Sequence, residues 1–374
     1  MRFLQTADWH IGRRLFGYDL LAEQAAVLSQ VATIAQEEQV DAIVIAGDLY
    51  DRQNPNETAV ALLDATIQQL NLSLKLPLLV ISGNHDSGVR LGVGADWFAE
   101  TDYFLRTTLA SVDQPLTLGD TQFFLLPYFE PFQARQFLQD DSIHTVAQAM
   151  TQLVARMQAQ FTPGLQHVLV AHFFAAGSTH SDSETTVAVG GLDAVPLDQL
   201  AGFDYVALGH IHNKNALHSE RVRYSGSLNK FSLSEVDQTK GVLIVETTPA
   251  LTVKFRPVTP LHDVQNIRGA FADLSDPDYL RQHQIDQTAY TGIVLQDTNI
   301  ISNASGKLKA QFPRFLTMQR EQSVQLAQRQ HLTQAQIKAP LQLLADFYQQ
   351  LTDKPLTPAQ QTWAAETLKE VDRS

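Results

Sequence analysis

Asn84, His85 and Asp86 form a run of three side chains that can bind a metal ion or move a proton. They follow an apolar run at residues 78–81 and a turn of two small residues. This pattern is typical of a β-strand that carries functional groups at its end. Alone it is weak, because Asn, His and Asp after Gly are also ordinary turn residues that form local side-chain to backbone hydrogen bonds.

Four other apolar runs end in similar residues. Residues two apart in an extended segment face the same way, so Asp8 and His10 can reach one cation together. Each residue alone has an ordinary explanation as a helix cap, a core histidine or a turn residue. Five such ends in one chain, in this order, are hard to obtain by accident. The residues at the four other ends are Asp8 with His10, Asp48, His172, and His210 with His212.

These residue types suit chemistry at a phosphate. Two divalent cations about 3.5–4 Å apart can orient a phosphate and stabilise the oxygen charge of an in-line displacement. A carboxylate such as Asp48 can bridge both cations. Neutral imidazoles and the carbonyl of Asn84 fill the remaining positions without adding negative charge that would repel phosphate. The set therefore indicates hydrolysis of a phosphoester.

The composition describes a globular chain and limits the metal. At 374 residues, 44% of them hydrophobic, the chain has core material for a large domain and one or two smaller units. It contains no cysteine, so disulfides and thiolate ligands are excluded. A metal held by His, Asp, Asn and water is more typically manganese, magnesium or iron than structural zinc.

Charge and targeting signals limit partners and location. The formal net charge of −13 argues against a surface that binds nucleic acid throughout, although a local basic patch or a partner could supply positive charge. Arg13, Arg14, Arg90 and Lys214 lie near the motifs and are candidates for such contacts. No basic and apolar leader and no run of about 20 apolar residues is found, so we expect a cytoplasmic protein.

Strands and helices alternate through the first half of the chain. Strands separated by helices at this spacing predict a parallel sheet with right-handed crossovers, and such sheets carry their sites at the carboxyl ends of the strands. Segments 221–224 and 241–246 are predicted to close the domain as antiparallel strands. The predicted strands are 2–7, 40–46, 78–82, 123–126, 167–171 and 204–208, and the predicted helices are 19–39, 56–70, 89–105 and 143–161.

The pattern changes near residue 259, where we expect a domain boundary. The large domain then covers residues 1–258, and a small α/β unit covers 261–320. The small unit is predicted to have strands at 264–268, 290–295 and 315–318 around two short helices. Residues 335–374 form a predicted helical tail, with one helix from Pro340 and another that opens at Thr357 and Pro358 through N-cap and N1 preferences.

The ordered set of motifs resembles the calcineurin-like metallophosphoesterase superfamily. The resemblance runs from residues 3–12 through 205–212 and 224–227, and it continues into the carboxyl-terminal helices. It implies a two-sheet α/β sandwich core with a small α/β capping domain and a helical C-terminal tail. Leu228 and residues 213–215 depart from the residues common in similar proteins, but they lie outside the metal set.

The resemblance also implies a role for each motif residue. His85 would protonate or stabilise the leaving oxygen without binding metal, and Asp86 would orient it. The metal is implied to be manganese, two ions per site, with magnesium as a substitute. One ion would be held by Asp8, His10, Asp48 and His212, and the other by Asp48, Asn84, His172 and His210.

Along its whole length the chain is similar to the DNA nuclease subunits of this superfamily. That likeness implies exonuclease action on duplex ends and endonuclease action on single strands and hairpins, in replication, recombination and repair. It implies a long coiled-coil ATPase as a partner and a homodimer through the segment after Asp86 within a heterotetramer. We expect the two amphipathic helices of the tail to dock on the coiled coil; the alternative is that they pack on their own domain. The alternatives are a phosphatase or small-nucleotide phosphodiesterase, for which residues 261–374 have no evident use, and a silent scaffold, which would have lost ligands.

Overall fold

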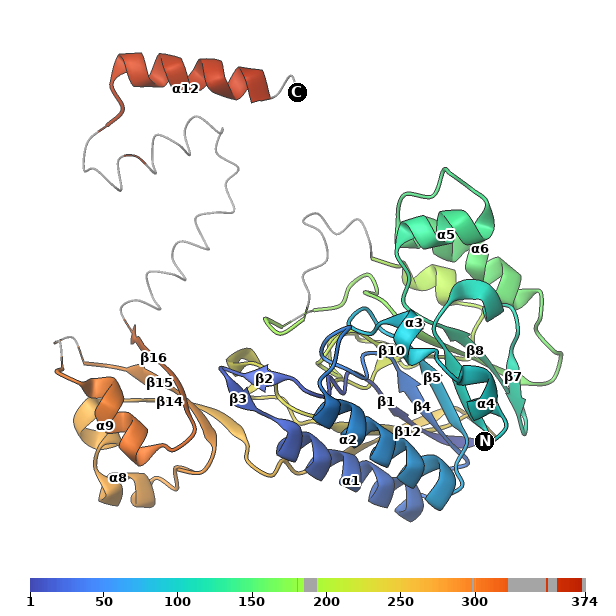
Figure 1. The fold of residues 1–374 in the computed structure, drawn as a ribbon, viewed down its shortest axis with the longest axis horizontal. Coiled ribbons are helices and arrows are strands. Elements are labelled where there is room, and N and C mark those ends of the chain that lie inside the picture. Colours follow the sequence, from blue (N-terminus) through green and yellow to red (C-terminus); the bar gives the residue numbers. More distant parts are fainter. Residues whose placement is uncertain are drawn as a thin grey trace.

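Two stacked sheets with helices on their outer faces make up the larger part of the molecule, and a small three-stranded unit lies to one side (Figure 1). This architecture is seen in a computed structural model. The structure describes residues 1–179, 181–184, 194–297, 299, 301–321, 348 and 355–371.

The first sheet has the strand order β13-β12-β1-β4-β5-β6. β1, β4, β5 and β6 run parallel to one another, while β12 pairs antiparallel with both β1 and β13. β1, β4 and β5 are almost wholly buried, as their continuous apolar runs predict. The strands are β1 (Arg2–Thr6), β4 (Ala42–Ala46), β5 (Leu78–Ile81), β6 (Tyr103–Arg106), β12 (Gly241–Glu246) and β13 (Thr252–Pro257).

The second sheet has the order β11-β10-β9-β8-β7. β8, β9, β10 and β11 are parallel, and only the β7 edge is antiparallel. The antiparallel arrangement predicted for residues 221–224 is therefore wrong, because β11 pairs in parallel with β10. The strands are β7 (Leu116–Leu118), β8 (Thr121–Leu126), β9 (Gln166–His172), β10 (Tyr205–Gly209) and β11 (Val222–Tyr224).

Apolar side chains fill the space between the sheets and the space beneath the helices. Phe3 of β1 meets Phe123 and Tyr205 of the second sheet edge to face, with ring centroids 5.4 and 6.0 Å apart. Separate clusters lie under the helices of each outer face, which completes a layered α/β/β/α sandwich. The helices are α1 (Leu21–Glu37) and α2 (Glu57–Ile67), continued by a π-helix (Gln68–Ser73), on one side, and α5 (Pro131–Leu138) and α6 (Val146–Gln158) on the other.

The segment 89–105, predicted as one helix, forms three shorter elements. α3 (Gly88–Leu91) and α4 (Ala95–Ala99) are separated by Gly94, whose φ of 83° is a left-handed conformation that ends helical geometry. Residues 103–106 then extend as β6, because they pair with β5 and complete the hydrogen bonding of that edge. The apolar pattern of this segment belongs to an exposed surface and a sheet edge.

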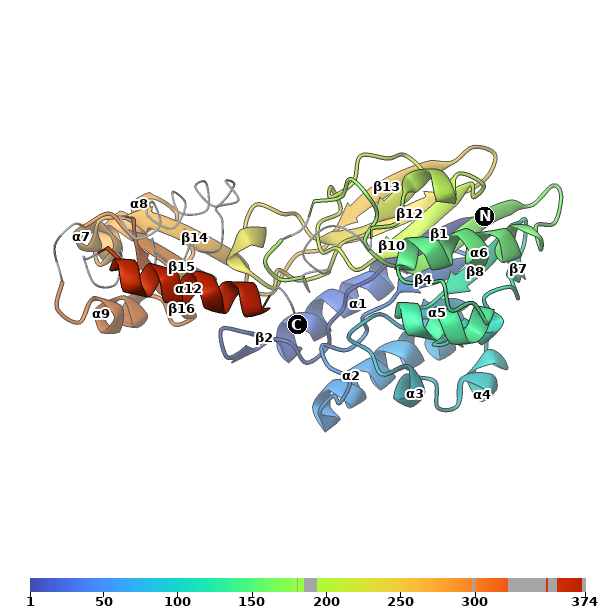
Figure 2. The same ribbon diagram turned by 90° about the horizontal axis from the view of Figure 1, so that it is seen from above.

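The small unit is a parallel sheet in the order β14-β15-β16. Its three strands fall where the sequence predicts them, but three helices accompany them among the described residues, one more than expected. Figure 2 shows this unit beside the sandwich, with the β2–β3 hairpin next to it. The elements are β14 (Val264–Gly269), α7 (Phe271–Leu274), α8 (Pro277–Gln282), β15 (Tyr290–Leu295), α9 (Ala304–Gln311) and β16 (Phe315–Arg320), with β2 (Arg14–Leu15) and β3 (Tyr18–Asp19) in the hairpin.

Helix α1 touches both the small unit and the sandwich loops through two neighbouring side chains. Glu23 is buried and accepts hydrogen bonds from the His262 backbone N–H at 3.0 Å and from the Tyr290 hydroxyl at 3.3 Å. Its other contact is with His262 Nδ1 at 2.7 Å. Gln24 donates to the carbonyls of Trp9 and His10 at 3.1 and 2.7 Å. One helical turn therefore holds two parts of the molecule.

The tail contains α12 (Pro358–Val371). Thr357 opens it as predicted: its hydroxyl accepts the Gln360 N–H at 3.4 Å, and the Gln360 side chain accepts the Thr357 N–H at 2.9 Å. The helix predicted from Pro340 lies outside the described residues, apart from residue 348. Within the described residues, no helix is both long enough and apolar enough to cross a membrane.

Candidate metal centre

Five strands from the two sheets end at one place and bring the predicted site residues together. Carboxyl ends of parallel strands meet at the same edge of a sheet, so the loops after them share one region. β1, β4 and β5 of the first sheet lead to Asp8, Asp48 and Asn84. β9 and β10 of the second sheet lead to His172 and to the pair formed by His210 and His212.

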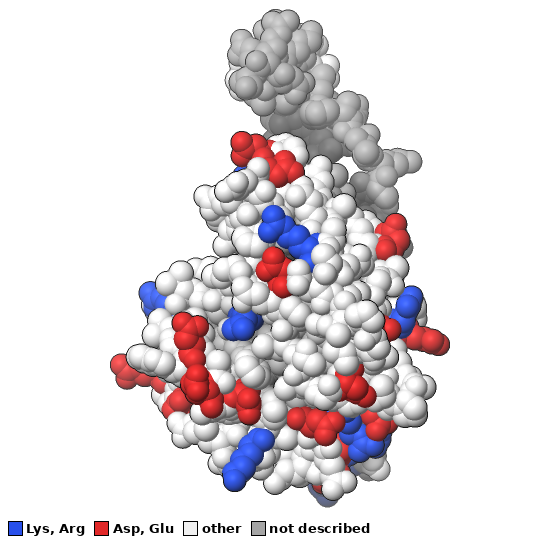
Figure 3. Space-filling view, turned by 90° about the vertical axis from the view of Figure 1, so that its right-hand side faces the viewer, with Lys and Arg blue, Asp and Glu red and all other residues white. Residues whose placement is uncertain are grey.

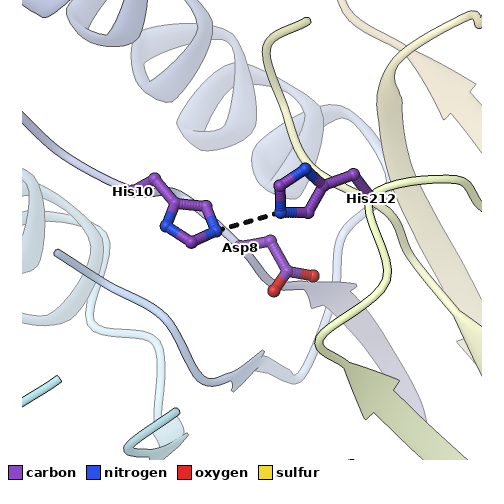
Figure 4. A group of neighbouring side chains, drawn as sticks. All are labelled: Asp8, His10 and His212. Atoms are coloured by element: carbon purple, nitrogen blue, oxygen red, sulfur yellow. Dashed lines mark hydrogen bonds between the residues drawn. The ribbon is translucent and has the colours of Figure 1, made fainter. Parts of the chain in front are cut away.

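Asp8, His10 and His212 form one group (Figure 4). The Nε2 atoms of His10 and His212 are 3.1 Å apart, and one atom from each of the three side chains lies within 4.8 Å of the others. His10 Nε2 is also 3.6 Å from Oδ2 of Asp48. These atoms face a common point between β1 and the loop after β10.

Asp48 belongs to a second group, with His172 and with Asp8, which is a member of both groups. Its Oδ2 is 3.3 Å from His172 Nε2. The Asn84 carbonyl oxygen lies 2.9 Å from His172 Nε2 and 3.0 Å from His210 Nδ1. Asp48 therefore stands between the two groups, in contact with His10 on one side and His172 on the other.

The donor atoms fit a pair of divalent cations. Two ligands of one octahedral ion, each about 2.1 Å from it at right angles, lie roughly 3 Å from each other, close to the spacings found here. Asp8 and Asp48 are buried, and in the described part of the chain neither forms an ion pair with Lys or Arg. A buried carboxylate needs a positive charge beside it, which a bound cation would supply. When bound, the cations would activate water and stabilise charge on phosphate oxygens.

Burial keeps most of the imidazoles neutral, as metal binding requires. It lowers the pKa of His10 well below its usual range and that of His210 to about 3. Burial acts in the same direction on His172, but the adjacent Asp48 carboxylate raises the pKa of that ring to about 9. The same contact lowers the pKa of Asp48 despite its burial. A cation between Asp48 and His172 would replace the shared proton.

The backbone is strained at four of the site residues. Asp8, His10 and Asp48 have φ values of 55°, 44° and 54°, and His210 has a φ of 97°. Residues other than glycine seldom adopt these values, and such strain persists only where surrounding contacts enforce it. The concentration of strained residues at the strand ends marks this region as functional.

Close packing at the strand ends explains why glycine, Gly209, precedes His210. A Cβ on Gly209 would lie 2.8 Å from His172 Nδ1 and closer still to the Ala46 carbonyl oxygen. That carbonyl accepts the His172 Nδ1–H at 2.8 Å, which leaves Nε2 free to bind a cation. Only glycine allows the second sheet to approach β4 closely enough for this arrangement.

His85 is half-buried and forms a third such group with His10 and Asp51. Its Nδ1 is 2.9 Å from the Asp51 carbonyl oxygen, and its backbone N–H donates to Asp48 Oδ1 at 2.8 Å. The ring meets His10 edge to face at 4.7 Å. With Nδ1 engaged by this carbonyl, Nε2 is the ring atom that would take part in proton transfer.

The carboxylate of Asp86, which the sequence predicts to orient His85, binds backbone N–H groups of the loops after β4 and β5. Oδ1 accepts the Tyr50 backbone N–H at 3.0 Å, and Oδ2 accepts those of Leu49 and Gly83 at 3.2 and 2.9 Å. Burial and the charge of Asp48 raise the pKa of Asp86 to about 6. The side chain thus fixes the loops after β4 and β5 to each other.

Several contributors to the site lie outside the motifs that the sequence reveals. Ser183 and Glu184 precede β10, and Glu235 and Lys240 follow β11, yet all four surround His212. No spacing in the sequence links them. Among the basic candidates, Arg13 has its guanidinium next to Asp51, at 3.2 Å, and 5.0 Å from the Phe231 ring centroid.

Comparison with known proteins identifies the class. Residues 1–214 match the family model of calcineurin-like phosphoesterases, and residues 260–352 match that of the Type 5 capsule protein repressor C-terminal domain. A solved dimetal phosphatase from Danio rerio is similar at 14% identity over 69% of this chain and 96% of its own, with a TM-score of 0.43. A solved protein from Thermus thermophilus is similar at 12% identity over 69% of this chain and 99% of its own, with a TM-score of 0.37.

The sandwich with its two ligand groups is that of a calcineurin-like phosphoesterase, which acts as a hydrolase. The SbcD chain of the SbcCD nuclease from Staphylococcus epidermidis is 34% identical over 364 residues, 96% of each chain. The chain belongs to the SbcD family of calcineurin-like phosphoesterases. Together with the ligand groups, this membership implies dependence on a divalent metal ion.

Proposed function

We propose that the protein is the nuclease subunit of an SbcCD complex and hydrolyses phosphodiester bonds in DNA with two Mn²⁺ ions, which Mg²⁺ can replace. The observation that carries this proposal is the convergence of two ligand groups on Asp48, in a chain similar over its whole length to an SbcCD nuclease subunit. Asp8, His10, Asp48 and His212 would hold one ion. Asp48, Asn84, His172 and His210 would hold the other.

His85 is the proposed proton donor to the leaving oxygen. Its Nδ1 is held by the Asp51 carbonyl and its backbone by Asp48, so the ring has a fixed direction relative to the ligand groups. The proton that moves would be carried on Nε2. Asp86 supports this geometry by joining the backbone of residues 49 and 50 to Gly83.

DNA as the substrate rests on the similarity to the SbcCD subunit rather than on surface charge. Figure 3 shows one face on which Lys and Arg side chains are scattered among Asp and Glu, without a continuous basic patch. With a net charge of −13, the protein would depend on a limited contact area or on its partner to hold DNA. The proposed activities are exonuclease action on duplex ends and endonuclease action on single strands and hairpins. Chromosomal DNA as the substrate implies a cytoplasmic location and a role in replication, recombination and repair.

Metal-dependent cleavage tests this function directly. Purified protein will cleave duplex, hairpin and single-stranded DNA when Mn²⁺ is present, and chelation with EDTA will stop the reaction. The assay is repeated with the SbcC ATPase and with p-nitrophenyl phosphate as a simple monoester. Hydrolysis of the monoester with no cleavage of any DNA, with or without SbcC, would identify a phosphatase instead. Absence of hydrolysis of every substrate would support a silent scaffold.

The domain organisation suggests how the partner binds. We propose a nuclease domain at residues 1–258, a capping domain at 261–320 and a partner-binding tail at 335–374. The support is that β13 ends at Pro257, β14 begins at Val264, and the small sheet has its own buried core. The tail would dock its apolar faces on the coiled coil of SbcC. On α12, the Trp363 side chain is 69% exposed and is a candidate contact.

A homodimer is the proposed arrangement of two nuclease subunits within a heterotetramer. The segment after Asp86 exposes four large apolar side chains: Val89 is 85% exposed, Val93 71%, Trp97 81% and Phe98 37%. Val93, Trp97 and Phe98 line a cavity of about 610 Å³ beside α2 and α4, together with Leu63, Leu91 and other residues. Apolar side chains at such exposure, beside an apolar cavity, are typical of a surface that another protein chain covers.

The variant Trp97→Glu will weaken the dimer. A buried tryptophan contributes strongly at interfaces, so losing it and adding a charge should cost at least about 2 kcal/mol, a factor of about 30 in the dimer Kd. Light scattering across a concentration series measures the change. Phe132→Glu is the matched control, because Phe132 is 49% exposed on α5 outside this segment. If wild-type protein is monomeric at micromolar concentration, or if both variants behave alike, this surface is not the dimer interface.

A further inference from the structure

A chain of polar side chains leads away from the ring of His212 on the side opposite the ligand groups. The His212 Nδ1 atom is 2.8 Å from the hydroxyl of Ser183. That hydroxyl makes a short hydrogen bond with Oε1 of Glu235. Oε2 of Glu235 is paired with the ammonium group of Lys240. Ser183, Glu235 and Lys240 are all buried, at 8%, 0% and 7% exposure.

The chemistry of the four groups fixes the direction of every hydrogen bond in this chain. A lysine ammonium group only donates, so it favours the ionised carboxylate of Glu235, which only accepts. The Ser183 hydroxyl must therefore donate its proton to Glu235. Its lone pair is then left to accept, so His212 Nδ1 must carry a proton and donate it. A neutral imidazole protonated on Nδ1 has its lone pair on Nε2, the atom that faces His10.

The backbone of His212 is held by the same set of residues. Its N–H donates to Glu184 Oε1 at 2.7 Å, and its carbonyl accepts from Lys240 Nζ at 2.9 Å. Arg13 donates to the Ser183 carbonyl at 2.9 Å. The ring, its peptide groups and the loop that carries Ser183 are thus fixed together around one point.

We propose that Ser183, Glu235 and Lys240 are positioning residues that set the tautomer and direction of His212 for metal binding. This inference rests on the metal centre proposed above. It assigns a role to a buried ion pair that lies outside the ligand groups. The contrast with His10 strengthens it: within the described residues, the Nδ1 atom of that buried ring has no hydrogen-bond partner. Of the two rings in the group formed by Asp8, His10 and His212, the His212 ring is therefore the one that hydrogen bonds at Nδ1 orient.

Removal of the Ser183 hydroxyl tests whether this chain of hydrogen bonds orients His212. In Ser183→Ala, His212 loses the acceptor for its Nδ1–H, and the affinity of one of the two Mn²⁺ sites will fall by roughly 10–100-fold, the usual effect of losing such a partner. Ser183→Thr keeps a hydroxyl and will restore binding. Ser234→Ala is the matched control, because the Ser234 hydroxyl accepts the Asp182 N–H at 3.2 Å and so anchors the same loop without touching His212. Calorimetric titration with Mn²⁺ measures each affinity, and thermal melting confirms that each variant is folded.

The tautomer itself gives a readout independent of metal and activity. In metal-free protein carrying ¹⁵N-labelled histidine, with the signal assigned by comparison with His212→Asn, His212 will show a protonated Nδ1 and an unprotonated Nε2. The Ser183→Ala variant will show a mixture of tautomers. Two results would refute the positioning role of Ser183, Glu235 and Lys240. One is a wild-type His212 ring protonated on Nε2, and the other is equal Mn²⁺ affinity in Ser183→Ala and Ser234→Ala. Wild-type protein that binds no Mn²⁺ would instead refute the proposed metal centre.

Discussion

His85→Asn will bind both Mn²⁺ ions and lose most of its nuclease activity. The ring lies beside the ligand groups, its Nδ1 is held by the Asp51 carbonyl, and its backbone N–H is bound to Asp48. Asparagine keeps the backbone bond and a similar volume, but it cannot carry a proton to the leaving oxygen. Loss of a general acid typically lowers the rate by roughly 10²–10⁴-fold. Single-turnover cleavage of a hairpin DNA measures the effect on the rate constant of the chemical step.

Two comparisons make the His85 result specific. His144→Asn replaces a histidine whose side chain is exposed and distant from the motifs in sequence, and it should cleave DNA at the wild-type rate. Calorimetry should give His85→Asn the same Mn²⁺ stoichiometry as the wild-type protein. Full activity in His85→Asn would exclude it as the proton donor. Loss of one Mn²⁺ ion would show that His85 is a ligand. Its closeness to His10 and Asp51 would then explain that role.

Asp48→Asn will lose high-affinity Mn²⁺ binding at both positions and will have no measurable nuclease activity. Its carboxylate is the group that contacts His10 on one side and His172 on the other. An amide has one acceptor oxygen and no charge, so it cannot bridge two cations. The loss of affinity should exceed the roughly 10–100-fold that follows from removing an outer partner of a ligand. Titration with Mn²⁺ measures both sites in one experiment.

Asp64→Asn is the matched control for this substitution. Asp64 is an exposed carboxylate on α2 that accepts a hydrogen bond from Gln68, and its neutralisation should change neither metal binding nor cleavage. If Asp48→Asn retains one site at wild-type affinity, Asp48 belongs to a single ligand group. The bridging arrangement would then be incorrect, although the second group could still bind one ion.

The ligand groups could be predicted from the sequence because parallel strands have a simple geometry. Each buried strand is one short apolar run, and its carboxyl end necessarily lies beside those of its neighbours. Asp8, Asp48, Asn84, His172 and His210 each follow such a run, so their proximity is predictable from the order of the strands. The alternation of apolar runs and helical stretches likewise predicted parallel strands, whereas the division into two sheets was implied by the family resemblance alone.

Features that depend on contacts between distant segments could not be predicted in this way. The parallel pairing of β11 with β10 is set by where the loop between them returns, and no residue in Val222–Tyr224 encodes that direction. Exposed Trp97 and buried Leu105 have the same apolar character in the sequence, so segment 89–105 resembles one helix. Glu235 and Lys240 have the composition of a surface pair, and only the fold shows that they are buried behind His212.

Helix α1 makes the small unit and the candidate metal centre mechanically dependent on each other. Glu23 binds His262 and Tyr290 on the side of the small unit, and the next residue, Gln24, binds the carbonyls of Trp9 and His10. A rotation of the small sheet must either break the Glu23 bonds or pull on the helical turn that also holds the His10 loop. A pulling force on the chain beyond β16 would therefore be transmitted to the loop that carries His10. The path runs through the small sheet and one turn of helix α1.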